Sequence, residues 1–204
     1  MIGEIGYLGQ VSKRVGILSA ALYNVGTTLG AGLLGLCLGS IGFALRWLLD
    51  DLHTLNSPTL LIPVALLSLI GGLNDIGILH LGTVGPIRQL PRSYMYVFGP
   101  YKTGFLWGLF VGMSYRTRFG YALYWVLGIW ALFAGSPLLG MGVMTLYGFI
   151  HGFVILADIV SVAYGKDVGE GLFGQKRTLL FYPMSGVALI ALCVLALSQL
   201  LRLI

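Results

Sequence analysis

The chain has 204 residues, of which 57% are hydrophobic and only 9% are charged, and its mean hydropathy is +0.92. A soluble domain carries about 25% charged residues, so this composition excludes an ordinary soluble globular protein and indicates an integral membrane protein. The formal net charge of +5 is explained by basic loops beside anionic membrane lipids, and it predicts no nucleic-acid partner.

Five long apolar segments follow one another along the chain, and the few charged residues cluster between them. Each segment is long enough to cross a hydrocarbon layer, which takes about 20 residues of helix. We therefore predict an all-α fold, a single integral membrane domain over 1–204 with five to six transmembrane helices. The predicted spans are 16–46, 58–82, 103–134, 137–163 and 179–203.

Two of the predicted spans, 16–46 and 103–134, are longer than the range of about 17–25 residues that a simple crossing needs. The first is rich in glycine and contains the polar run YNVGTT, and the second has Gly104, Gly108 and Gly112 before SYRTR. Glycine at four-residue spacing lets helix backbones approach closely, and neighbouring helices then satisfy polar groups that a break leaves free. We predict that both segments break into two pieces.

The positions of the basic residues predict the orientation of the chain. If the five segments each cross once, most lysines and arginines share one side, whereas the other side has the acidic link DDLHTLNSP. By the positive-inside rule, the N-terminus is cytoplasmic. The predicted location is a bacterial plasma (inner) membrane. The residues on the predicted cytoplasmic side are Lys13, Arg14, Arg88, Arg92, Lys102, Lys166, Lys176 and Arg177.

Ionisable residues inside apolar segments are the candidates for a functional site, because charge is costly in the bilayer and is kept where it pairs or lines a cavity. His151 and Asp158 lie seven residues apart and so share a helix face, whereas Asp75 and His80, five apart, diverge. Imidazole and carboxylate groups together suit a proton relay or a transition metal, but the spacing matches no metal motif, and we predict no metal site. The candidate intramembrane polar site contains Asp75, His80, Arg116, Arg118, His151 and Asp158.

Arg116 and Arg118 allow two interpretations. In the first, YRTRFGY is an interfacial turn, and both side chains reach the lipid headgroups. In the second, one arginine turns inward against an acid, with Asp158 the favoured partner, because residues two apart on a helix point about 200° from each other. Asp75 and Asp158 are open to a purely structural role as well, paired with an arginine or with a backbone amide. His80, near the end of its span, is expected at the membrane interface.

The cysteines and the remaining polar residues give no sign of catalysis. Cys37 and Cys193 lie alone in apolar runs, so we expect packing roles and no disulfide framework. Nothing in the sequence pairs a nucleophile with a base, so the chain is predicted not to be an enzyme, and the sequence indicates no particular cofactor.

One stretch carries a resemblance to a known family. GFLWGLFVGMSYRTRFGYALYW, followed by GSPLLGMGVMTLYGFIHGFVIL, resembles the second half of the cytochrome c biogenesis transmembrane and thiol-disulfide interchange proteins, within the broad lysine-exporter superfamily. The resemblance implies about six helical pieces in two related halves. The Pro-Cys pairs of that family are absent here: SYRTR stands at the second, and Cys37 lacks the adjacent proline of the first, which argues against a thiol relay.

These features leave two functional hypotheses from different classes. The first is a small transporter that moves a cation, a proton or a small anion through an intramembrane cavity built from the two broken segments. The second is a non-catalytic subunit or assembly factor of a larger membrane complex, favoured by the sparse polar content and the glycine-rich and aromatic packing surfaces. The expected partners are membrane lipids and either copies of the same chain or other membrane subunits.

Overall fold

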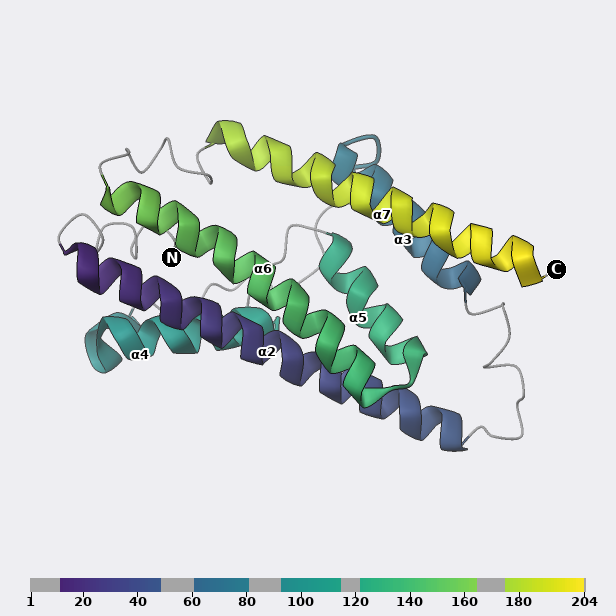
Figure 1. Cartoon of the computed structure of the whole chain (residues 1–204), viewed down its shortest axis with the longest axis horizontal. Coiled ribbons are helices and arrows are strands. Elements are labelled where there is room, and N and C mark those ends of the chain that lie inside the picture. Colours follow the sequence, from purple (N-terminus) through teal and green to yellow (C-terminus); the bar gives the residue numbers. More distant parts are fainter. Residues whose placement is uncertain (1–11, 49–60, 81–92, 115–121, 165–174, 204) are drawn as a thin grey trace. The chain divides into compact units, whose positions relative to one another are not determined.

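The computed structural model of the chain describes residues 12–48, 61–80, 93–114, 122–164 and 175–203. The regular structure within these residues is entirely helical, which confirms the predicted all-α class (Figure 1). The helices are α2 (Lys13–Leu48), α3 (Leu61–Ile76), α4 (Ser93–Gly112), α5 (Ala122–Ala134), α6 (Pro137–Ala163) and α7 (Gln175–Leu203).

The prediction that 16–46 breaks into two pieces was wrong, because α2 is one helix of 36 residues. Its polar run stays helical since the hydroxyls of Thr27 and Thr28 donate to the carbonyls of Tyr23 and Asn24, four residues back, at 2.8 Å in both cases. These bonds satisfy the side chains inside the helix itself. The glycines of α2 serve close packing against neighbouring helices, not a break in the helix.

The predicted break in 103–134 is confirmed, because α4 ends at Gly112 and α5 begins at Ala122. Helix α4 also starts earlier than the predicted span, at Ser93. It contains a kink where Gly99 (φ 71°) precedes Pro100. A positive φ is readily adopted by glycine, and proline at the next position starts a new helical stretch with its fixed φ. The predicted segment 103–134 is therefore interrupted once, and the kink lies before it, in the part of α4 that the prediction left out.

Helix α3 is shorter than the predicted span 58–82, since it ends at Ile76. Gly77 adopts φ +89°. The Ile78 amide donates to the Leu73 carbonyl at 2.9 Å, and the Gly77 amide donates to the backbone carbonyl of Asn74 at 3.0 Å. This pair of bonds is a Schellman motif, which satisfies the last carbonyls of a helix.

The helices form two compact units. Unit 1 contains α2 up to Leu34, α4, and α6 from Met144; unit 2 contains α2 from Gly35, α3, α5, α6 up to Val143, and α7 from Leu180.

In unit 1, glycines of α4 lie directly against the backbone of α2. A Cβ atom at each of them would collide with a carbonyl of α2, so only glycine allows this separation. The pairs, in order along both helices, are Gly104 with Ser19, Gly108 with Tyr23, and Gly112 with Thr27. Residue numbers rise together in the two helices, which shows that α2 and α4 run parallel.

Helix α6 packs on the same part of α2 in the opposite direction. Gly148 lies against Thr27, and Gly152 lies against Asn24, so the numbers fall in one helix as they rise in the other. Three helices of unit 1 are thus held together through glycine contacts, with small and polar residues facing inward.

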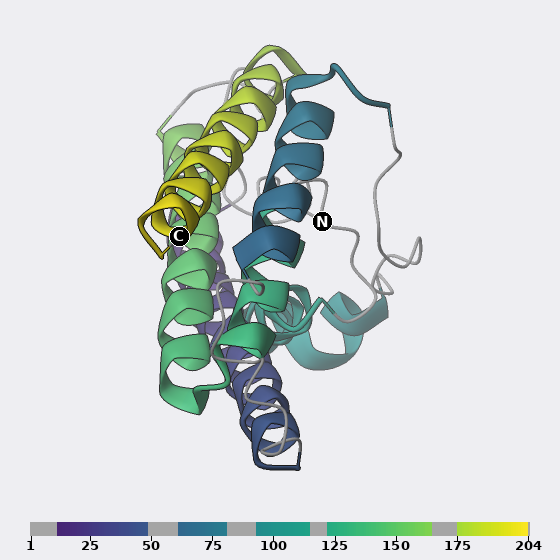
Figure 2. The same cartoon turned by 90° about the vertical axis from the view of Figure 1, so that its right-hand side faces the viewer.

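In unit 2, α3 and α7 are antiparallel neighbours and lie side by side in both views (Figures 1 and 2). Gly72 meets Gly186, and further along Ala65, Cys193 and Ala196 form a buried cluster. Cys193 therefore has the packing role expected of it, whereas Cys37 is exposed.

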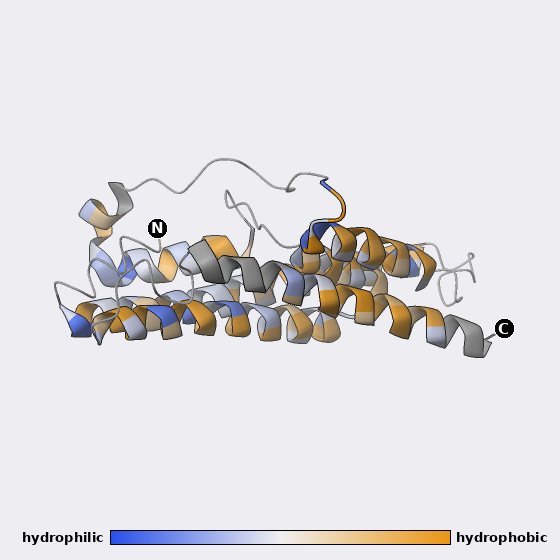
Figure 3. Ribbon diagram, turned by 90° about the horizontal axis from the view of Figure 1, so that it is seen from above, coloured by the Kyte–Doolittle hydropathy of each residue, from blue (hydrophilic) through white to orange (hydrophobic). Residues whose placement is uncertain are grey.

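Large hydrophobic side chains point outward from the helices. On α2 the exposed large hydrophobic residues include Leu18, Val25, Leu29 and Leu33, whereas the buried residues include Ser19 and Thr27. Hydrophobic residues, coloured orange, occur in most helical turns in Figure 3. Small and polar residues inside with large apolar residues outside is the pattern of helices packed in lipid. By length and composition, two described helices, α2 and α6, could cross a membrane.

Candidate functional site

Asp75 is the acid that the structure places most distinctly among hydrogen-bond donors. It lies in the last turn of α3 and is only 4% exposed. Its Oδ2 accepts a hydrogen bond of 2.6 Å from the Ser185 hydroxyl of α7 and one of 3.0 Å from the Ala122 amide, and its Oδ1 lies 3.2 Å from the same amide. Asn74 adds a side-chain hydrogen bond to the same carboxylate. The carboxylate thus joins three helices, α3, α5 and α7.

The Asp75 carboxylate lies at the N-terminus of α5, where its negative charge is electrostatically favourable. Ala122 is the first residue of α5, and the first turn of this helix contains no acid of its own. A helix N-terminus carries a partial positive charge and amides without internal partners. Asp75 supplies from another helix both the acceptor and the negative charge that this helix end needs.

The other end of α5 is held by the opposite charge. The Arg46 guanidinium of α2 donates a 2.9 Å hydrogen bond to the Phe133 carbonyl, in the last turn of α5. Gly135 follows with φ +56° and lies against the Arg46 side chain, where a Cβ would meet its Cδ at 2.7 Å. A cation at a helix C-terminus complements its partial negative charge. Helix α5 is therefore capped at both ends by charged side chains of neighbouring helices.

These caps hold the two ends of a short helix. With 13 residues, α5 is roughly 20 Å long. Its buried end groups need partners, because a buried amide or carbonyl without one costs free energy. Asp75 and Arg46 provide such partners, and Ser185 holds Asp75 in place by a hydrogen bond. We call these three residues, with Ala122, the α5 anchor.

Unit 1 holds the other acid and imidazole of the candidate set. Asp158 is buried and His151 is half-buried, both on α6. The His151 ring stacks on Tyr147, with centroids 6.1 Å apart and planes at 9°. The side chain of Asn24, on α2, lies at the neighbouring Gly152. The predicted common face of His151 and Asp158 agrees with their positions on a continuous helix.

Several buried polar atoms of unit 1 have no hydrogen-bond partner in the structure, and two of them belong to side chains that are almost completely buried. These two are the Ser19 hydroxyl on α2 and the Trp107 indole nitrogen on α4. Both side chains are at most 1% exposed. A buried polar atom without a partner costs about 1–3 kcal/mol, so such atoms are places where water or a small ligand stabilises the fold.

The structure does not gather the six predicted residues into one described site. Asp75 belongs to unit 2, whereas His151 and Asp158 belong to unit 1. His80 is exposed just beyond the end of α3, in keeping with an interfacial position. Arg116 and Arg118 lie outside the described residues, so their two interpretations stay open. For Asp75 the geometry agrees with the alternative of pairing with a backbone amide.

Sequence reasoning missed two members of the α5 anchor. Ser185 is one of many serines in apolar runs, and nothing local distinguishes it. Arg46 carried a signal, because Arg46 and Arg202 are the basic residues at span ends on the side that has little other positive charge. Its partner, a carbonyl 87 residues away in the sequence, is visible only in the fold.

The residues that the structure describes offer no grouping of three or more His, Cys, Asp or Glu side chains around a possible metal position.

No protein-family model matches the chain, and comparison with characterised proteins and with solved structures gives no significant match. The resemblance to cytochrome c biogenesis proteins therefore stays a prediction.

Proposed function

We propose that this chain is a multi-pass membrane protein that acts as a small transporter, moving a proton or a cation with Asp75 as the group that binds it. The observation that carries the proposal is the α5 anchor. There, the buried carboxylate of Asp75 holds the N-terminus of α5, which is the short second piece of a discontinuous helical segment. Discontinuous helices with functional groups at their ends are a recurring feature of transporters.

The membrane location is supported by the outward apolar faces of the helices and by their directions. Five crossings require α2 and α4 to run one way and α6 the other, and they require α3 to oppose α7. The glycine contacts within unit 1 and within unit 2 agree with these directions. The basic residues of α2 and α4 also support a cytoplasmic N-terminus. Ser19 lies against Gly104, so Lys13 and Lys102, which precede them, lie toward the same end of unit 1.

The presence of Asp75 at the N-terminus of α5 disfavours an anion as the transported species. In transporters of this kind a free helix N-terminus attracts the anionic group of a substrate. Here the chain's own Asp75 occupies that position, so an anion would compete with a carboxylate already in place. A proton or a cation, in contrast, binds the carboxylate itself.

Protonation of Asp75 would change the contacts of three helices at once. The ionised carboxylate accepts from Ala122 and Ser185, and its charge complements the α5 dipole. A neutral acid loses that charge and gains a donor, which weakens its attraction for the amide at the start of α5. Binding of a proton is thereby coupled to release of α5 from α3 and α7, the kind of two-state element that gating needs.

The test is proton flux in proteoliposomes containing the purified chain, with a pH-sensitive dye inside and an imposed pH gradient. We expect the wild type to dissipate the gradient and Asp75→Asn to reduce the rate at least tenfold, because amide oxygen accepts hydrogen bonds without titrating. Ser198→Ala, whose hydroxyl bonds only the Leu195 carbonyl of its own helix, is the matched control and should behave as wild type. Wild-type flux from a folded Asp75→Asn protein would show that the carboxylate is a structural cap alone.

A specific observation also favours the second candidate, a non-catalytic subunit or assembly factor. Before the kink of α4, Tyr96 is 91% exposed, and Val97 and Phe98 are exposed beside it. Exposed aromatic residues are enriched in protein interfaces. Purification from the native membrane in mild detergent separates the two candidates. A stoichiometric set of other chains supports the subunit, and a chain that is stable alone or with its own copies supports the transporter.

A further inference from the structure

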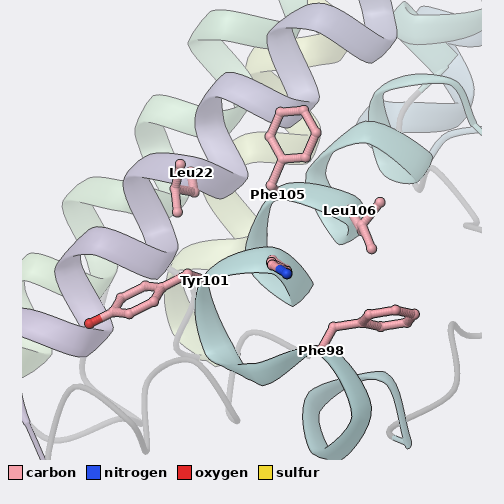
Figure 4. Close-up of a pocket in the computed structure, with 6 residues that line it drawn as sticks. Leu22, Phe98, Tyr101, Phe105 and Leu106 are labelled. Atoms are coloured by element: carbon pink, nitrogen blue, oxygen red, sulfur yellow. The ribbon is translucent and has the colours of Figure 1, made fainter.

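A groove of about 490 Å³ lies between α2 and α4 in unit 1. Figure 4 shows Leu22 and Tyr101 on one side and Phe98 and Leu106 on the other, and Phe105 and Lys102 complete the lining. The volume lies within the range of about 300–1,000 Å³ that is usual for ligand sites. All of the lining is apolar or aromatic except for one ammonium group and one phenol.

The kink of α4 gives the groove its form. Gly99 and Pro100 redirect the chain between Phe98 and Tyr101, so aromatic residues on both sides of the kink line the same space. Both of these side chains are exposed, as is Lys102. The groove therefore opens outward, to the surroundings of the helices.

On the described residues of the two helices that form the groove, every charged side chain is basic. Lys102 is the only charged residue of α4, and the described part of α2 that belongs to unit 1 contains Lys13 and Arg14 and no acid. The Lys13 ammonium lies over the Tyr164 ring, 5.1 Å from its centroid. Lys102 thus stands at the mouth of an apolar groove with no acid on either helix that forms it.

We propose that this groove binds an anionic phospholipid of the cytoplasmic leaflet, with an acyl chain against Leu22, Phe105 and Leu106 and its phosphate at Lys102. The ligand must have a long apolar part for the lining and a negative group for the ammonium. Anionic lipid has both, and it is concentrated on the side of the membrane where Lys102 is predicted to lie. The proposal depends on the membrane location of the chain and is independent of whether it transports anything.

The chemistry of the groove also argues against a soluble anion. Free phosphate would meet one exposed ammonium group and no other described donor apart from the Tyr101 hydroxyl, whereas built phosphate sites converge several donors. The apolar lining would contribute nothing to binding such an ion. A lipid, in contrast, buries that lining on binding.

The experiment is native mass spectrometry of the purified full chain with dioleoylphosphatidylglycerol, and in parallel with dioleoylphosphatidylcholine. We expect one phosphatidylglycerol to be retained in preference to phosphatidylcholine. Lys102→Gln should weaken its affinity about fivefold, the loss expected when one lysine near an anionic lipid is neutralised. Arg14→Gln is the matched control: it removes the same charge from an exposed position of the same unit and should leave this affinity unchanged.

Two further arms test the apolar part of the site. Leu22→Trp fills the groove without changing its charge and should abolish preferential retention, with folding checked by thermal unfolding. Addition of inorganic phosphate should not displace the lipid. Equal losses from Lys102→Gln and Arg14→Gln would overturn the proposal, because they would indicate diffuse attraction to a basic surface. Full binding by Leu22→Trp, or displacement by phosphate, would overturn it as well.

Discussion

Helices α4 and α5 are the two pieces of one predicted span, yet the protein holds them by different means. Helix α4 lies in unit 1 against α2, and glycines provide the contact along its length. Helix α5 lies in unit 2, where it packs on α3 and, at Gly42, on α2, and it is also held at its two ends by Asp75 and Arg46. The first attachment depends on shape, and the second adds charge at the helix ends.

The difference follows from the lengths and compositions of the two helices. Helix α4 has 20 residues with glycine at four-residue spacing, so it presents a smooth face that fits another backbone. Helix α5 has 13 residues and a mostly large, apolar sequence, ALYWVLGIWALFA, with one internal glycine. A short helix has many unsatisfied end groups for its length. In an apolar surrounding, charged caps from other helices are the effective way to satisfy them.

The largest effect in this comparison is expected from Gly108→Leu. The side chain would collide with the Tyr23 carbonyl and the Thr27 amide, neither of which can move without displacing α2. Overpacking costs about 1–3 kcal/mol when side chains can adjust, so against backbone we expect at least about 3 kcal/mol, measured as thermal stability in detergent. Gly142→Leu is the matched control, because a Cβ there meets nothing within 4 Å. Wild-type stability of Gly108→Leu would mean that α4 does not pack on α2 as described.

An intermediate effect is expected from Arg46→Gln, which removes the cation at the C-terminal end of α5. A charge-assisted hydrogen bond contributes about 1.5–3 kcal/mol, and since Arg46 is only partly buried we expect a loss of about 1–2 kcal/mol in detergent unfolding. The control is Arg14→Gln, at the exposed start of the same helix. If both changes have the same small effect, the end of α5 is not held by charge.

The smallest effect is expected from Ser185→Ala, which removes one of the donors to Asp75. The carboxylate keeps the Ala122 amide and Asn74 as partners, so the loss should be about 1 kcal/mol, the net value of one hydrogen bond. Ser198→Ala, on the same helix but exposed, should cost nothing measurable. The two variants can be compared in one thermal unfolding series, and a larger loss from Ser198→Ala would contradict the assignment of the anchor.

Several features of the fold follow from the sequence by itself. The apolar runs predict helices, and α6 coincides with its predicted span because Pro137 marks its start and its run is uninterrupted. The break after Gly112 was predicted from length and glycine spacing, and the role of the stripe 104/108/112 as a close-packing face agrees with the structure. These inferences succeed because helix formation depends on residues close together in the chain, and because the four-residue glycine spacing that allows close packing lies within one helix.

Other features were decided only by tertiary structure. Glycines and a polar run predicted a break in α2, but glycine contacts made by α4 and α6, together with Thr27 and Thr28 bonding within the helix, keep it continuous. The same residues are compatible with a break or with close packing, and only a neighbour selects between them. The partners of Asp75 and Arg46 are likewise set by contacts across 47 and 87 residues of sequence. A lone charge in an apolar run shows that a partner is required, and the fold determines which group it is.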